Sequence, residues 1–281
     1  MSLRGLTVMI TGASRGIGFE IARLLAERGW KLGITARGRG KLEEAADRLG
    51  TGNAIAIACD VADLAEAEDA ARRVTERFGP ITALVNNAGV GGGGRYGEWT
   101  DAGWEWTIGV NLMSVIWGIE IFGPLIEAHG DGGQIVSTAS IAGFLPVTNP
   151  PYNVTKFGVV ALSEGLRTEL EPRGIGVSVL CPGFIRTKIL ESARNVPDRF
   201  AGARDTTGED ANLDNSEFAE MARQAIAHGI DPLYVGELVR EGIEGNWPYI
   251  FTDNEFEPAI MERFANVKAG FDRIRGRVPR H

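Results

Sequence analysis

Cysteine and histidine are scarce in this 281-residue chain, which holds two cysteines and three histidines. Cys59 and Cys181 lie in separate apolar runs, so we expect no disulfide framework, and a reducing, cytoplasmic location is favoured. His129, His228 and His281 are far apart and lack the short spacing that metal ligands need. The sequence therefore predicts no metal site.

Long apolar runs and an excess of positive charge are also missing. No apolar run approaches the roughly 20 residues that span a bilayer, so we expect no membrane helix. The first residues lack the apolar core and cleavage site of a secretory signal. Acidic residues outnumber basic ones by 37 to 29, giving a net charge of -8. A negative surface repels phosphate backbones, so nucleic acid is not an expected partner.

Short apolar runs alternate with helical patterns along most of the chain. The runs are hydrophobic throughout rather than at every second residue, which is typical of strands buried on both faces. This pattern predicts an α/β fold with a doubly wound, seven-stranded parallel sheet of the Rossmann type. The expected strands are residues 6–10, 31–36, 54–58, 81–85, 134–138, 176–180 and 247–252, and the expected helices include 41–49, 64–78, 102–128, 152–173, 217–228, 232–244 and 258–275.

The alternation breaks after Pro182. Residues 191–216 are polar and nearly devoid of large apolar side chains, and a stretch of this length in a compact domain is typically a functional lid or disordered. We see no linker or repeat, so we predict one domain over residues 1–281. Its core motifs lie in 6–187, its substrate lid in 188–246, and its last strand and closing helix in 247–281.

A glycine-rich turn, Thr11-Gly-Ala-Ser-Arg-Gly-Ile-Gly18, lies where the first strand gives way to a helix. Glycines allow backbone N–H groups to approach phosphate oxygens, and the helix N-terminus adds partial positive charge. The spacing differs from the common Gly-x-Gly-x-x-Gly, and a turn without chemical significance is the alternative. Its position after the first strand favours a dinucleotide site.

The end of the second strand bears on which dinucleotide is bound. An acidic residue there would bond the ribose hydroxyls and repel a 2′-phosphate, but this strand ends Thr35-Ala36-Arg37. Arg37 offers a forked cation for a phosphate dianion, and Arg15 lies in the glycine-rich turn. The sequence therefore favours NADP(H) over NAD(H). The alternative is that Arg37 and Arg39 are solvated loop charges.

Tyr152 and Lys156 are four residues apart at the start of a predicted helix, so they share a face. A free tyrosine has a pKa near 10 and is a poor acid–base catalyst at neutral pH. A nearby ammonium favours the phenolate, whereas burial acts in the other direction. The pair predicts acid–base chemistry if the cation dominates. The alternative is a tyrosine packed on an amphipathic helix.

These motifs, with Asn86-Asn-Ala-Gly89 and Pro182-Gly183, occur in the order that is typical of the short-chain dehydrogenase/reductase family. The match extends from about Leu6 to Thr187 and resembles the short, single-domain branch. The resemblance implies an NAD(P)(H)-dependent enzyme that interconverts a secondary alcohol and a ketone. The alternative is a non-catalytic dinucleotide-binding regulator, which would be expected to have lost a catalytic residue.

The resemblance also implies roles for individual residues. Tyr152 is similar to the general acid of the family, Lys156 to the lysine that lowers its pKa and holds the nicotinamide ribose, and Ser140 to the serine that bonds the substrate oxygen. Asn111 is similar to the asparagine of a proton path. The cofactor-binding set that it implies is Gly12, Ser14, Arg15, Gly16, Ile17, Gly18, Arg37, Asp60, Val61, Asn87, Ala88, Gly89, Tyr152, Lys156, Pro182, Gly183 and Thr187. Ser140 is 12 positions before Tyr152, one fewer than is common, and its alternative role is a strand-end hydroxyl.

Large apolar residues near these motifs suggest a bulky apolar or aromatic substrate. Phe184 and Ile189 flank the predicted lid, Phe144 and Leu145 follow the serine, and Tyr96 and Trp99 follow a second glycine-rich stretch. Members of the family mostly form dimers or tetramers through two long helices. The resemblance therefore implies a homodimer or homotetramer, with residues 102–128 and 152–173 at the interface.

Overall fold

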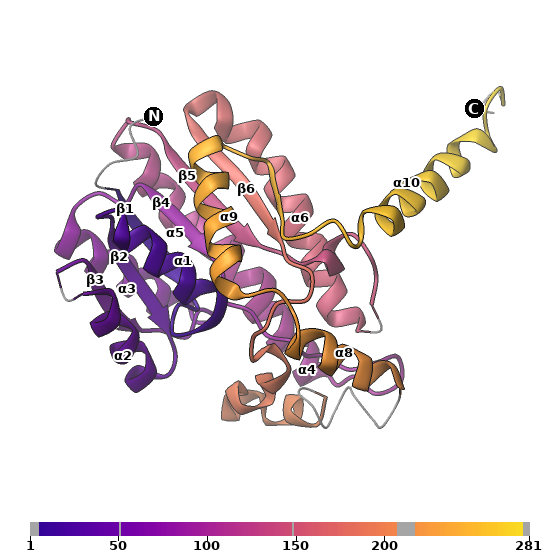
Figure 1. Cartoon of the computed structure of the whole chain (residues 1–281), viewed down its shortest axis with the longest axis horizontal. Coiled ribbons are helices and arrows are strands. Elements are labelled where there is room, and N and C mark those ends of the chain that lie inside the picture. Colours follow the sequence, from indigo (N-terminus) through magenta and orange to yellow (C-terminus); the bar gives the residue numbers. More distant parts are fainter. Residues whose placement is uncertain (1–5, 51, 148, 207–216, 278–281) are drawn as a thin grey trace.

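The computed structural model describes residues 6–50, 52–147, 149–206 and 217–277 (Figure 1). A parallel seven-stranded sheet in the order β3-β2-β1-β4-β5-β6-β7 forms its centre, as the sequence predicts. The strands are β1 (Thr7–Thr11), β2 (Lys31–Ala36), β3 (Ala54–Ala58), β4 (Ala83–Asn86), β5 (Gly133–Thr138), β6 (Ile175–Cys181) and β7 (Tyr249–Phe251). The α-helices are α1 (Gly16–Glu27), α2 (Arg39–Leu49), α3 (Leu64–Phe78), α4 (Asp101–Ile108), α5 (Ser114–Ala128), α6 (Pro150–Leu170), α8 (Glu217–Ala227), α9 (Pro232–Gly245) and α10 (Glu257–Asp272).

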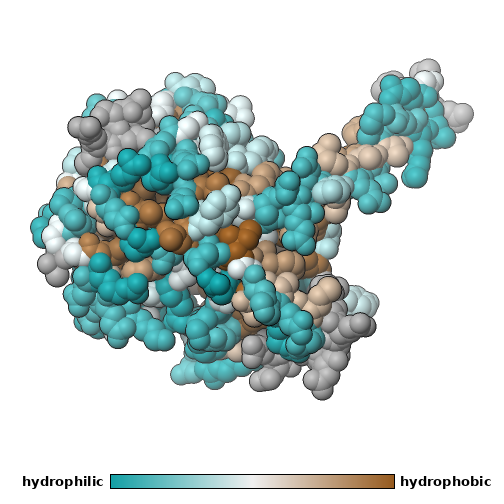
Figure 2. Space-filling model, in the orientation of Figure 1, coloured by the Kyte–Doolittle hydropathy of each residue, from teal (hydrophilic) through white to brown (hydrophobic). Residues whose placement is uncertain are grey.

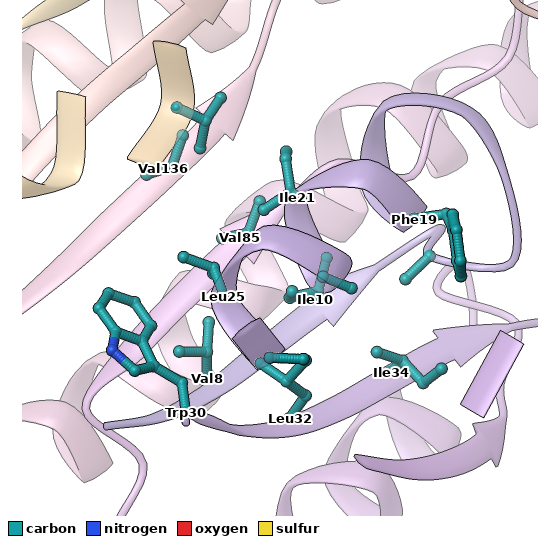
Figure 3. Packing of buried hydrophobic residues seen from close by; sticks show 14 of the residues in the cluster. Val8, Ile10, Phe19, Ile21, Leu25, Trp30, Leu32, Ile34, Val85 and Val136 are labelled. Carbon is teal, nitrogen blue, oxygen red and sulfur yellow. The ribbon is translucent and has the colours of Figure 1, made fainter. Parts of the chain in front are cut away.

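Helices cover both faces of the sheet, which explains the continuous hydrophobicity of the strands. On one face, α1, α2 and α9 pack on side chains such as Val8, Ile10 and Leu32. Figure 3 shows Ile21 and Leu25 of α1 pointing toward these strand residues. On the other face, α3, α5 and α6 pack on Met9, Leu84 and their neighbours. Successive residues of β1 therefore enter opposite cores.

The position of β1 determines where a ligand can bind. β1 pairs with β2 on one side and β4 on the other, so the chain reverses its direction of winding between them. The carboxyl ends of the strands then border a crevice at this switch point, which is the usual ligand site of open α/β sheets. The glycine-rich turn and the residues after β4 lie at this edge.

One predicted helix is divided in the structure. Residues 102–128 form α4, a π-helical turn (Gly109–Met113) and α5 rather than one regular helix. The turn contains Asn111, whose side chain bonds the backbone of Val90, and such turns are frequent at functional sites. By length and composition alone this segment could span a bilayer, and 28% of its most apolar window is buried in the fold. Trp106, Phe122 and Ile126 are among its buried residues.

The polar stretch after β6 is more ordered than the sequence predicts. It begins with two 3₁₀ segments, Ile189–Asn195 and Asp198–Thr206, and residues 207–216 lie outside the described part of the chain. Val196 and Ala203 are buried against Trp106 and Val110, with Phe200 packed beside them. A few isolated apolar residues therefore fix the segment, although they form no periodic pattern.

The helix α10 extends away from the sheet and its covering helices (Figure 1). Ile260 at its start is buried with residues of α6 and β6, and Arg263 lies over the ring of Phe157 on α6. Beyond these two residues the helix is almost wholly exposed.

Candidate active site

A cavity of about 760 Å³ lies at the carboxyl ends of the strands. It joins the ends of β2 and β3 to the loop after β6 and to α8. Of the predicted site residues, Gly12, Ser14, Arg15, Gly16, Ile17, Arg37, Asp60, Val61, Asn87, Ala88, Gly89, Ser140, Tyr152, Lys156, Pro182, Gly183 and Thr187 line it. Gly18 and Asn111 do not line it and lie behind its wall.

The glycine-rich turn is held by close backbone packing. Gly12 has φ +68°, and a Cβ there would lie 2.8 Å from the Cα of Ala88. A Cβ on Gly18 would lie 2.4 Å from the side-chain nitrogen of Asn87. That amide donates to the carbonyls of Thr11 and Gly12 at 3.0 and 3.3 Å. Asn87 and Gly18 therefore shape the turn, and Asn87 also lines the cavity.

The N-terminus of α1 fits the pyrophosphate of a dinucleotide. Arg15 precedes the helix in an extended conformation, its side chain does not cap the helix, and the first turn contains no acidic residue. The first N–H groups are consequently without helical partners at the cavity wall, where they can bind phosphate oxygens.

Thr138, which also lines the cavity, has a buried hydroxyl with no hydrogen-bond partner among the described residues.

Three charged residues meet at the adenosine end of the cavity. Arg37 and Asp60 line it at the ends of β2 and β3. Asp60, whose side chain is 12% exposed, accepts a hydrogen bond at 2.8 Å from Arg199, whose side chain is 47% exposed. Burial lowers the pKa of Arg37, the charge of Asp60 raises it, and the charge of Arg199 lowers it. Two guanidinium groups therefore share one carboxylate here.

The catalytic candidates come from the end of β5 and the start of α6. Ser140 follows β5, and its hydroxyl accepts from the backbone N–H of Ala142 at 3.1 Å. Asn149 caps α6 by accepting from the backbone N–H of Tyr152 at 3.3 Å. One turn further on, the Lys156 ammonium donates to the carbonyl of Thr138 at 2.9 Å and lies 5.6 Å from the centre of the Tyr152 ring. The structure thus brings Ser140, Tyr152 and Lys156 together.

Burial dominates the proton affinities of this group. It raises the pKa of Tyr152, and a hydrogen bond with Ser140 opposes that rise. It also lowers the pKa of Lys156 to about 8, although the neighbouring Cys181 thiol acts in the other direction. The family resemblance implies that the charge of Lys156 lowers the pKa of Tyr152. In the structure burial is the larger effect, and the lysine is bonded to a carbonyl.

Asn111 lies behind the catalytic group. Its side-chain oxygen accepts from the N–H of Val90 at 2.8 Å, and its amide donates to the carbonyl of Val90 at 2.9 Å. Gly89 separates it from the lysine, since a Cβ on Gly89 would lie 3.5 Å from the Asn111 oxygen and 3.6 Å from the Lys156 nitrogen. The side chain of Asn111 therefore positions the loop after β4.

The far end of the cavity is mostly apolar. Its wall includes Ile141, Leu145, Val147, Phe184, Ile189, Leu190, Met221, Ile226 and Phe256. Phe144 is not among these residues, because it packs on Tyr249 and Phe251 at the sheet edge. Tyr96 and Trp99 make an edge-to-face contact with each other and also lie outside the wall. Three of the proposed substrate contacts are thus misplaced, whereas Leu145, Phe184 and Ile189 line the cavity.

Sequence reasoning missed several polar residues of the cavity. Asp231 caps α9 and forms an ion pair with Arg186 from the loop after β6. Arg194 donates to the carbonyl of Glu191 at 2.5 Å, and Arg15 contributes to the lowering of its pKa, after burial. The dipeptide Asp231-Pro232 signals a helix start and could have located that cap. Nothing in the sequence pattern distinguishes Arg194 from the polar residues around it.

A glycine-rich turn at the switch point, an open helix N-terminus and a Ser–Tyr–Lys group in one cavity define a dinucleotide-dependent oxidoreductase. Comparison with known proteins agrees with this class. The family described as short chain dehydrogenase matches residues 6–197. The chain belongs to this short-chain dehydrogenase/reductase family, which confirms the resemblance, the fold class and the enzyme class.

Individual relatives are similar over nearly the whole chain. C alpha-dehydrogenase of Sphingobium sp. is 33% identical, with 92% of this chain and 84% of the relative covered. A short chain dehydrogenase/reductase of Burkholderia phymatum, solved in complex with NAD, is 30% identical with a TM-score of 0.88 and 96% of each chain covered. A variant of actinorhodin polyketide ketoreductase, solved with NADPH, is 32% identical with a TM-score of 0.70, covering 88% of this chain and 94% of that one. The cofactor is therefore a nicotinamide dinucleotide.

Proposed function

We propose that the protein is an NADP(H)-dependent carbonyl reductase that also catalyses the reverse reaction, the oxidation of a secondary alcohol. Tyr152 is the general acid in reduction and the general base in oxidation. The observation that carries the proposal is the group of Ser140, Tyr152 and Lys156 in one cavity, with an apolar wall on one side and the dinucleotide turn on the other. A non-catalytic regulator would not need all three residues.

Each residue of the group has a separate task in ketone reduction. The bound nicotinamide supplies the hydride. Ser140 donates a hydrogen bond to the carbonyl oxygen of the substrate, and Tyr152 donates the proton that this oxygen takes up. Because burial raises the pKa of Tyr152, the phenol is protonated and ready for reduction at neutral pH. Alcohol oxidation requires the phenolate, which Ser140 and the positive charge of Lys156 favour.

The preference for NADP(H) rests on the charges at the adenosine end. Arg37 takes the position where an acidic residue would select NAD(H). Of the carboxylates that line the cavity, Asp60 is paired with Arg199 and Glu20 with Arg23. A 2′-phosphate would meet a site with more positive than negative charge. Solved relatives contain NAD in one case and NADPH in another, so the selectivity must come from residues such as these.

The wall of Leu145, Phe184, Ile189, Met221 and Phe256 favours a bulky apolar or aromatic ketone. Such a wall excludes water from the reacting atoms and gives little support to a highly charged substrate.

We further infer a homo-oligomer that packs α4–α5 and α6 between subunits, since half-buried apolar residues such as Trp104, Leu112 and Trp117 remain on these helices. We also propose a reducing, cytoplasmic location, which the two buried free cysteines support.

The proposal is tested by assaying a panel of aromatic, aliphatic and charged ketones with NADPH and NADH, following nicotinamide absorbance. We expect the best turnover with an apolar ketone and NADPH. Tyr152→Phe should lower kcat by about 10²–10⁴-fold, the usual size of a general acid's contribution. Tyr249→Phe is the matched control, because the Tyr249 hydroxyl bonds Glu164 outside the cavity.

Equal rates for wild type and Tyr152→Phe would exclude Tyr152 as the proton donor. Binding of NADPH without turnover of any ketone or alcohol would favour the regulator.

A further inference from the structure

The helix α10 carries an apolar stripe on which no other element of the described chain packs. Met261, Phe264, Val267, Phe271 and Ile274 expose between 46% and 67% of their surfaces. Phe264, Val267, Phe271 and Ile274 continue the line that starts at the buried Ile260, at intervals of four and three residues, so they lie on one face of the helix. We call these exposed residues the arm stripe.

Within residues 6–50, 52–147, 149–206 and 217–277, no other element covers the arm stripe. α10 leaves the body beside α6 and extends away from it (Figure 1), and the space-filling view shows the arm standing apart from the rest of the surface (Figure 2). Isolated helices of about this length are marginally stable in water. The helix therefore needs a partner surface if it is to stay folded with four large apolar side chains along one face and Met261 exposed beside them.

The charges of the arm indicate what the partner is. Residues 261–277 contain five basic and two acidic side chains, whereas the whole chain has a net charge of -8, so the rest is strongly acidic. Arg263, Lys268 and Arg275 border the arm stripe, and Glu262 and Asp272 lie farther round the helix. Lys268 and Arg275 both pair with Asp272, so three positive charges face one paired carboxylate along this border. Two such arms packed on each other would bring like charges together. The arm is instead complementary to the acidic body of another copy.

A suitable surface lies next to the base of the arm, where α6 borders the edge strand β7. Tyr249 and Phe251 stack there and are 38% and 39% exposed. Glu164, which accepts a hydrogen bond from the Tyr249 hydroxyl at 2.6 Å, provides negative charge beside these rings. We call this group the acceptor face. It pairs apolar surface with an acidic residue, the complement of the arm stripe and its basic borders.

We propose that α10 is an intersubunit arm that packs its stripe on the acceptor face of a second copy of this chain. The arrangement is isologous, because each copy supplies one arm and one acceptor face. A helix of 16 residues is about 24 Å long and about 10 Å wide with its side chains. Two arms with their two acceptor faces would remove on the order of 1,000 Å² from solvent, which is the lower bound for a specific interface.

The test combines the association state with hydrogen exchange of the arm in the full-length protein. In wild type, the backbone amides of residues 261–274 should gain protection as the protein concentration rises and the assembly forms. Phe271→Glu should abolish this gain and raise the dissociation constant measured by sedimentation at least tenfold. Ala265→Glu, which adds the same charge on the other side of the same helix, should change neither. Glu164→Lys should weaken association most at low salt.

Arm amides that exchange freely at every concentration would overturn the proposal, as would equal association of Phe271→Glu and Ala265→Glu. Protection that arises only with vesicles of anionic lipid would assign the arm to a membrane surface instead. Every variant leaves the catalytic residues in place, so failure of the arm proposal leaves the proposed reaction unaffected.

Discussion

The two ends of the cavity are built on different physical grounds. At the catalytic end, Lys156 is 4% exposed, and burial changes the proton affinity of both Lys156 and Tyr152. At the adenosine end, Arg199 and Asp60 form an ion pair that is open to solvent on the arginine side. Removing one of the few buried catalytic groups should cost much activity. The solvent-exposed charges act together on the cofactor and are screened by salt, so removing one of them should cost less. At the catalytic end, the loss of a single hydroxyl should therefore change the rate strongly. At the adenosine end, single charge changes should alter cofactor affinity by smaller steps.

The largest effect in this comparison is expected for Ser140→Ala. The substitution removes a hydrogen-bond donor to the substrate oxygen, and losses of such donors typically cost about 10²–10³-fold in kcat. It also removes the bond to the N–H of Ala142, which caps one turn, so thermal unfolding should show a loss of about 1 kcal/mol. Steady-state kinetics with NADPH and the best ketone measure the first effect.

Ser163→Ala is the control for this substitution. Ser163 is buried more deeply than the half-buried Ser140, and its hydroxyl bonds the carbonyl of Val159 on the same helix, so its loss should not affect kcat. A kcat that is unchanged in Ser140→Ala would show that the serine is a strand-end hydroxyl only.

At the adenosine end, Arg37→Asp should lower the ratio of kcat/KM for NADPH over NADH by about 10–100-fold. Charge-assisted hydrogen bonds contribute about 1.5–3 kcal/mol, and a new carboxylate would also repel the 2′-phosphate. Arg39→Asp makes the same change of charge two residues away, outside the cavity wall, and should leave the ratio nearly unchanged. Equal effects of the two variants would show that net charge alone, rather than a contact, selects the cofactor.

A third contrast is the response to pH. The pKa of Lys156 lies at about 8, so its ammonium is present below this pH and is lost as the pH rises through it. The value of kcat/KM for the cofactor, which reports groups of the free enzyme, should therefore fall above pH 8 and approach a tenfold loss per pH unit. Tyr152 stays a phenol over this range because burial raises its pKa. A profile that is flat to pH 9.5 would contradict the role of the ammonium.

How well the sequence predicts each region follows the same division. The sheet, its helices and the Tyr152–Lys156 pair could be predicted, because buried strands and helix starts leave periodic or local signals. The close packing of Gly12 against Ala88 requires a residue without a side chain, so this contact is also marked in the sequence by a glycine. The π-helical turn at Asn111 leaves no such signal, since its cause is a tertiary bond to the backbone of Val90.

The structure of the segment after β6 is even harder to predict from the sequence. Its order depends on Val196, Phe200 and Ala203 meeting Trp106 of a distant helix, and 3₁₀ turns have no long period. The pair between Arg199 and Asp60 joins residues 139 positions apart, which a single sequence cannot reveal. The direction of the pKa shift at Tyr152 also required burial to be known.

The smallest effect is expected where this segment reaches the cofactor end. Arg199→Ala removes the partner of Asp60 and one positive charge near Arg37. Exposed ion pairs contribute about 0–1 kcal/mol, so the dissociation constant for NADPH should rise by no more than about fivefold, less at high salt. Arg204→Ala, which breaks a more exposed pair with Asp198 in the same segment, should leave NADPH binding unchanged. A hundredfold rise in the dissociation constant for NADPH in Arg199→Ala, independent of salt, would contradict this expectation. The adenosine end would then have to enclose its ligand as tightly as the catalytic end, and the two ends would not differ in the way described.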